Sequence, residues 1–145
     1  MNAPLYNTEI LRLAASTPTR RLPAPMATVE RRSPICGSRV TVDIALGSDG
    51  RIADIGMLVR ACALGQASST LFASHAIGHS PEELAAARDA LTAWLAGEGS
   101  QPDWPGIAIF APALPHSARH PSIRLAFEAG ADAAATAQSH AQAAA

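Results

Sequence analysis

A strictly alternating segment at residues 39–46 predicts a half-buried β-strand. A period of two residues is that of a strand with one buried side, and here one face carries Val40, Val42, Ile44 and Leu46. The turn sequence Gly-Ser-Asp-Gly follows at residues 47–50, and residues 52–59 fit a returning strand. These segments predict an antiparallel hairpin, which limits the chain to folds that can cover one face of a sheet.

Helices are expected on both sides of this hairpin in the sequence. Asn7 is a candidate N-cap for a helix over residues 7–15, because its side-chain oxygen can accept a hydrogen bond from an otherwise unpaired backbone N–H. Residues 64–75 follow the hairpin with a helical pattern of apolar and small side chains. Ser80 and Glu83 form a capping-box pattern with Pro81 at the first helical position, which predicts a helix that ends near Gly97.

The order of these elements indicates an α+β fold. Residues 27–32 are a candidate third strand, and a last helix is expected to begin near residue 121 after a proline-rich connection with one short helical turn at 107–110. Strands and helices are segregated, so we expect a three-stranded antiparallel sheet covered by helices, with a helix-rich C-terminal half. A single domain over residues 1–145 is expected; Gly130 weakens its last helix, and a flexible alanine-rich tail follows from about residue 133.

The charge and hydropathy of the chain exclude several classes of protein. The formal net charge of −1 gives no electrostatic footprint for nucleic acid or for an anionic membrane surface. No apolar run is long enough to span a bilayer, and the first residues do not read as a secretory signal. A cytoplasmic location is therefore expected, where thiols stay reduced and a structural disulfide is disfavoured.

Two cysteines are the candidate reactive groups. Cys36 precedes a glycine in a turn, and Cys62 lies immediately before a predicted helix, whose unpaired N–H groups favour an anion. Because the hairpin brings residues 38 and 60 to the same end of the sheet, the two thiols are expected to lie close together. The alternative is that both are ordinary buried side chains, since cysteine is among the residues most often buried.

Four segments resemble the iron–sulfur cluster assembly scaffold family of the IscU/SufU/NifU N-terminal type, and most closely its SufU-like branch. The resemblance covers residues from about 5 to 133. It rests on an opening Leu-Tyr-Asn-Thr-Glu-Ile-Leu, a Pro-Ile-Cys-Gly-Ser motif, a Cys-Ala-Leu-Gly-Gln-Ala-Ser-Ser motif and an Ala-Arg-His-Pro-Ser segment, which occupy residues 5–11, 34–38, 62–69 and 118–122.

The resemblance implies a fold with helices on one side of the sheet and a site for a nascent iron–sulfur cluster or a zinc ion. Family members hold this group with three cysteines and an aspartate, accept sulfur from a cysteine desulfurase and pass cluster or sulfur to recipient iron–sulfur proteins. Cys36 and Cys62 match two of the cysteines. Ser38 stands at the aspartate and Ser122 at the third cysteine, so His120 is a candidate additional metal ligand.

Three functions are compatible with this incomplete ligand set. A scaffold or sulfur acceptor would bind a cluster or metal through Cys36 and Cys62, with further ligands from His120, from a partner, or from a second subunit. In a homodimer, the four cysteines could hold one [2Fe–2S] cluster. The alternatives are a metal-free adaptor or regulator of a cysteine desulfurase, and a thiol or persulfide carrier. None of the three implies a turnover enzyme.

Overall fold

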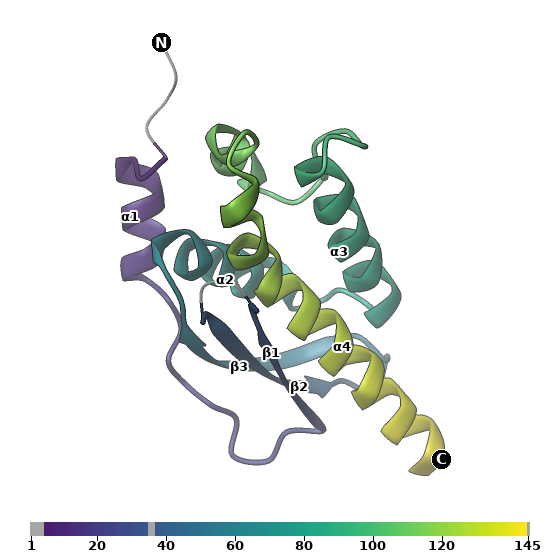
Figure 1. Cartoon of the computed structure of the whole chain (residues 1–145). Helices are drawn as coiled ribbons and strands as arrows, with labels where there is room; N and C mark the ends of the chain where they lie inside the picture. Colours follow the sequence, from purple (N-terminus) through teal and green to yellow (C-terminus); the bar gives the residue numbers. More distant parts are fainter. Residues whose placement is uncertain (1–4, 35–36, 145) are drawn as a thin grey trace.

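The computed structural model of the chain describes residues 5–34 and 37–144, and its elements follow the expected order (Figure 1). One helix precedes three strands, and further helices follow. The elements are α1 (Thr8–Ala15), β1 (Ala27–Arg32), β2 (Arg39–Leu46), β3 (Ile52–Arg60), α2 (Ala63–Ala76), α3 (Pro81–Leu95), the 3-10 helices η1 (Ile107–Ala113) and η2 (Ser117–Arg119), and α4 (His120–Ala144).

The three strands form one antiparallel sheet in the order β1-β2-β3. The register pairs Val29 with Val42 and Val42 with Met57, so the apolar side chains of neighbouring strands share one face. The predicted hairpin and third strand are confirmed, and so is the α+β class. A shift in register between Ala45 and Leu46 marks the end of the hairpin next to its turn.

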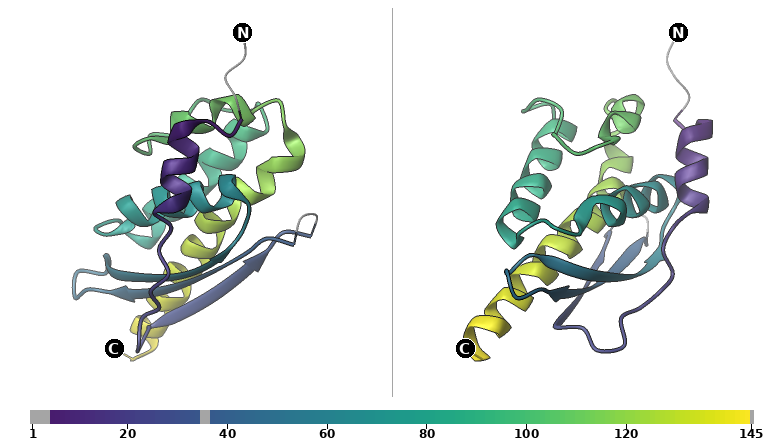
Figure 2. Two further views of the ribbon diagram at one scale, coloured as in Figure 1. Left: turned by 90° about the vertical axis from the view of Figure 1, so that its left-hand side faces the viewer. Right: turned by 180° about the vertical axis from the view of Figure 1, so that it is seen from behind.

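Helices cover the apolar face of the sheet. α4 packs against β1 and β2 and runs diagonally across them, and α2 lies between α1 and α4 (Figures 1 and 2). Val40, Val42 and Ile44 are fully buried beneath these helices. Burial of this apolar surface is the main favourable term for the fold, at roughly 25 cal/mol per Å².

The helix starts follow the capping chemistry in the sequence. The Asn7 side chain accepts a hydrogen bond from the backbone N–H of Ile10 at 3.0 Å. At the start of α3, the backbone N–H of Glu83 donates to Ser80 Oγ at 3.1 Å and the N–H of Ser80 donates to the Glu83 carboxylate at 2.8 Å. Both predicted N-caps are confirmed, and the capping box satisfies two backbone donors at once.

The C-terminal helix differs from its expected form. α4 continues to Ala144, and its buried residues include Ala133, Ala134 and Ala137, where a flexible tail was expected from about residue 133. Gly130 does not weaken a loose helix; it lies under the ring of Phe72 from α2, where a Cβ would overlap the ring. The small side chains of alanine and glycine therefore allow α2 and α4 to approach closely. Because these residues carry little apolar surface, the sequence does not reveal that this part of α4 is packed.

Candidate functional site

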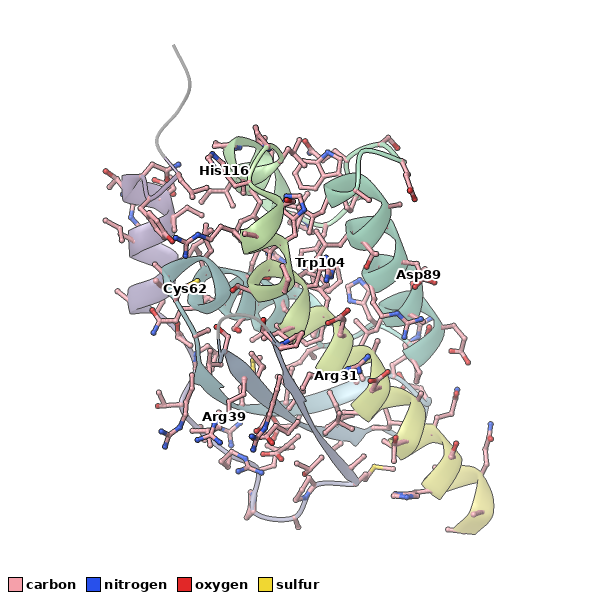
Figure 3. All side chains as sticks on the ribbon, viewed as in Figure 1. Arg31, Arg39, Cys62, Asp89, Trp104 and His116 are labelled. Atoms are coloured by element: carbon pink, nitrogen blue, oxygen red, sulfur yellow. The ribbon has the colours of Figure 1, made fainter. Side chains whose placement is uncertain are left out.

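Cys62 is the N-cap residue of α2. Its backbone is extended, with φ −66° and ψ 172°, and its carbonyl oxygen accepts from the N–H of Gln66 at 2.9 Å. The side chain makes no capping hydrogen bond, is half-buried, and packs at the border of the hydrophobic core. Figure 3 shows Cys62 at the end of the sheet where Arg39 also lies. A free thiol is therefore placed at the positive end of the α2 dipole.

The connection between β1 and β2 lies at this same end of the sheet. Arg39 pairs with Arg60 in the last register position of the hairpin, and the N–H of Ser33 donates to the carbonyl oxygen of Ser38 at 2.8 Å. Gly37 has φ +72°, the left-handed region that glycine enters without steric cost. Cys36 lies outside the described residues, so the predicted closeness of the two sulfurs stays a prediction.

The beginning of α4 reaches the same region from the other side. A Cβ placed on Gly65, in the first turn of α2, would lie 3.3 Å from the carbonyl oxygen of Ser122 and 3.6 Å from its Cβ. Ser68, about one turn further along α2, donates from its Oγ to the carbonyl oxygen of Ile123 at 2.6 Å. This hydrogen bond joins α2 to α4. The segment that resembles the third-cysteine region thus packs on the helix that Cys62 begins.

The two serines that stand at ligand positions of the resembling motifs, Ser38 and Ser122, are both buried. Ser38 is 5% exposed and Ser122 is 2% exposed, so both lie inside the protein at the end of the sheet that carries Cys62. A neutral serine hydroxyl is a poor substitute for the carboxylate or thiolate that metal sites use. By the resemblance in the sequence, these two buried hydroxyl groups would replace two charged ligands of the family pattern.

His120 begins α4 and is buried, with its Nε2 2.9 Å from the carbonyl oxygen of Ala113. Such a carbonyl can orient an imidazole and fix its tautomer, which is a common arrangement behind metal-binding histidines. In residues 5–34 and 37–144, however, no three side chains of His, Cys, Asp or Glu gather closely enough to hold a metal ion. The role of His120 as a ligand stays a prediction.

Two other histidines lie away from Cys62, around Trp104. His79 stacks on the Trp104 ring with the ring centroids 5.0 Å apart, and His75 meets the same ring edge-on at 6.3 Å. The Trp104 Nε1 donates to the carbonyl oxygen of Leu71 at 3.1 Å, and this tryptophan packs in the core. A pocket of about 370 Å³ opens beside His79, Glu83 and Trp104, and Cys62 does not line it.

One buried charge was not foreseen from the sequence. Asp43 lies within β2, fully buried on the sheet face away from α4, and receives a two-pronged ion pair from Arg21 at 2.7 and 2.9 Å. The Thr28 hydroxyl and the N–H of Leu22 also donate to it, at 2.7 and 3.0 Å. The Arg21 hydrogen bond holds the pKa of the Asp43 carboxyl below its usual value, against the opposing effect of burial. This cluster attaches the segment after α1 to the sheet.

These features define a class of α+β protein. A three-stranded antiparallel sheet carries its helices on one face, and a thiol sits where β3 passes into the following helix, against the start of the last helix. The fold is similar over almost its whole length to several solved structures. In the described residues no helix combines the length and the apolar character needed to cross a membrane.

The N-terminal part of a NifU-like, nitrogen-fixing protein from Brucella abortus is 38% identical, with a TM-score of 0.87 over 93% of this chain and 95% of that one. This chain therefore belongs to the NifU-like N-terminal family, which confirms the resemblance in the sequence. No family model and no curated protein matches the sequence.

Two further structures share the fold at lower identity. A candidate iron–sulfur cluster assembly scaffold protein for the SUF system, from Fervidobacterium islandicum AW-1, is 18% identical with a TM-score of 0.81, over 90% of this chain and 96% of that one. A hypothetical protein solved at 2.3 Å is 22% identical with a TM-score of 0.74, over 90% and 97% of the two chains.

Proposed function

We propose that this protein is an iron–sulfur cluster assembly scaffold or sulfur acceptor, in which Cys36 and Cys62 receive the cargo. The observation that carries the proposal is the position of Cys62, a free thiol at the N-terminus of α2 with the Ser122 segment of α4 packed on the same helical turn. Membership of the NifU-like family supports it, as does the shared fold with a candidate SUF scaffold.

The cargo needs more ligands than one chain offers at its cysteines. Iron–sulfur clusters are held mainly by thiolates, and zinc takes four ligands in structural sites. Two cysteines per chain give four in a homodimer, which is enough for one shared [2Fe–2S] cluster. His120 is the candidate ligand if a single chain holds the metal, because it lies two residues before Ser122 at the start of α4.

The proposed partners follow from this role. A cysteine desulfurase would supply sulfur as a persulfide to a thiol at the Cys62 end of the sheet, and recipient iron–sulfur proteins would take the assembled group. The protein binds and hands on its cargo, so we assign it no turnover reaction of its own. Free thiols persist in a reducing compartment, which supports a cytoplasmic location.

Reconstitution without oxygen tests the proposal. Protein purified anaerobically and incubated with iron and sulfide should show thiolate-to-iron absorption bands, bound iron and sulfide, and a dimer by light scattering. Cys36→Ala and Cys62→Ala should each abolish the colour, whereas Ser38→Ala serves as the matched control and should retain it. Wild-type protein that stays colourless and monomeric would contradict the scaffold role.

A metal-free adaptor is the second candidate, and the two buried serines favour it. Ser38 and Ser122 stand where the resemblance expects an aspartate and a cysteine, and a neutral serine hydroxyl is a poor metal ligand. An adaptor would bind a cysteine desulfurase through its fold alone. Capture of a purified desulfurase by the Cys36→Ala, Cys62→Ala double variant as strongly as by the wild type would support this candidate, and loss of capture would count against it.

A further inference from the structure

Three arginines stand side by side across the sheet, one on each strand. The register pairs Arg32 of β1 with Arg39 of β2, and Arg39 with Arg60 of β3. Directly paired residues of an antiparallel sheet project from the same face. The neighbouring position, Val40, is buried under the helices. The arginine row, Arg32–Arg39–Arg60, therefore projects from the opposite face, at the end of the sheet where Cys62 lies.

Within the part of the chain that the structure describes, two of the three arginines of the row have no acidic partner. Arg32 pairs with Glu30 on its own strand at 3.1 Å, but Arg39 and Arg60 have no ion pair or hydrogen bond from their side chains among the described residues. Like charges directly opposite each other on neighbouring strands, about 4.8 Å apart, destabilise a sheet. The fold therefore carries a cost at these two positions without an internal compensation.

The remaining arginines show how unusual these two are. The chain has eleven arginines and no lysine, and all eleven arginines lie in the described ranges. Arg119 lies over the ring of Tyr6, with 5.9 Å from its guanidinium carbon to the ring centroid. Every other arginine outside the row has an acidic partner; these are Arg12, Arg20, Arg21, Arg31, Arg51, Arg88 and Arg124.

An apolar side chain completes the surface. Leu58 lies two residues before Arg60 on β3, so it shares the face of the row, and its exposed fraction is 40%. Its cross-strand partner Thr41 is almost fully buried. The surface thus combines two unpaired guanidinium groups with one exposed leucine.

We propose that this face binds an acidic, extended segment of a partner protein. Carboxylates match the fork geometry of arginine and form charge-assisted, two-pronged hydrogen bonds with it. An extended segment with acidic residues at alternate positions presents carboxylates about 6.6 Å apart on one side, and the long arginine side chains of the row, on strands about 4.8 Å apart, are flexible enough to reach them. An apolar residue of the same segment would cover Leu58. The inference needs no metal and stands apart from the cargo proposed above.

A short synthetic peptide with alternating Glu and Ser and one central Leu tests the proposal, with the Gln-for-Glu peptide as its control. Titration followed by NMR should shift the side-chain Nε–H signals of Arg39 and Arg60, and affinity should fall as salt is raised. The Arg39→Glu, Arg60→Glu variant should bind at least about tenfold more weakly, since charge-assisted hydrogen bonds are among the strongest polar contacts.

Two further variants distinguish specific peptide binding by the arginine row from an effect of net charge and from a loss of folding stability. Arg12→Glu, Arg119→Glu makes the same change in net charge away from the row and should keep the wild-type affinity. Arg39→Gln, Arg60→Gln should lose peptide binding while its melting temperature stays equal or rises, because the opposed charges are gone. Equal loss in the Arg12, Arg119 variant would overturn the proposal. So would equal binding of the Gln peptide, or binding only to RNA or to vesicles of phosphatidylserine and phosphatidylcholine.

Discussion

Ser122 lies directly against Gly65. A Cβ on Gly65 would stand 3.3 Å from the Ser122 carbonyl oxygen and 2.6 Å from the Cβ of Ala61, so only glycine fits between them. Gly65 is about one helical turn from Cys62, the N-cap of α2. Ser122 therefore packs against the first turn of the helix that follows Cys62. The position that resembles the third cysteine of the family is therefore beside Cys62 even though it carries a serine here.

Restoring the family ligands should create a stronger metal site. In the Ser38→Asp, Ser122→Cys variant we expect tighter zinc binding than in the wild type, because zinc prefers four ligands and two are added. Loss of outer-shell partners alone changes metal affinity by about 10- to 100-fold, so added ligands should change it at least that much. Competition with a chromophoric chelator measures the gain. The Ser38→Ala, Ser122→Ala variant is the control, and an equal affinity in both would contradict the placement of these residues.

Close packing of α2 on α4 predicts an unfavourable effect of a substitution that usually favours helices. Gly130→Ala would normally stabilise a helix by about 1 kcal/mol. Here the added methyl group meets the Phe72 ring, and overpacking of this kind costs about 1–3 kcal/mol. We expect a net loss in the free energy of unfolding by urea. An unchanged or higher stability would show that the two helices are further apart than described.

Local signals were readable from the sequence, and contacts between distant segments were not. The Ser80 capping box and the alternation in β2 depend on neighbouring residues, so they were predicted with their positions. Gly130 was expected to weaken its helix because glycine has a low helix propensity. The Phe72 ring that requires a glycine there belongs to another helix, so no local pattern reveals the contact. The Asp43 ion pair joins residues that lie 22 apart, and no local pattern marks it.

At the candidate site, too, the local features were predicted from the sequence and the contacts between distant segments were not. The sequence motifs placed Cys62 before a helix, and the structure confirms that position. The burial of Ser122 follows from how α4 packs on α2, which no local pattern of residues shows. The arginine row likewise exists only through the strand register, because its three members come from separate parts of the chain.

The capping box of α3 predicts a moderate loss on removal. Ser80→Ala removes the oxygen that accepts from the N–H of Glu83, and loss of such an N-cap costs about 1 kcal/mol. Urea denaturation measures the change. Thr92→Ala is the control, since its exposed hydroxyl only donates back to the Arg88 carbonyl oxygen within the helix. A loss in the Ser80 variant no larger than in this control would show that the cap contributes little.

The buried carboxylate of Asp43 predicts a loss of stability in acid. Arg21 holds the folded-state pKa of this carboxyl below the unfolded value of about 3.9. Its stabilising contribution is therefore complete above about pH 4 and is lost as the pH falls through the folded-state pKa. The free energy of unfolding of the wild type should decline across that acid range.

Asp43→Asn should remove this pH-dependent contribution and lower the stability at neutral pH. Breaking one partner of a fully buried ion pair costs about 3 kcal/mol, and the loss expected here is smaller because the Arg21 side chain is 45% exposed. Denaturation by urea at closely spaced values between about pH 2 and pH 5 should give a flatter profile for the variant than for the wild type. Asp54→Asn is the matched control, because the Arg20–Asp54 pair is exposed and contributes less than about 1 kcal/mol. Parallel profiles for Asp43→Asn and the wild type would show that another carboxylate governs the acid transition.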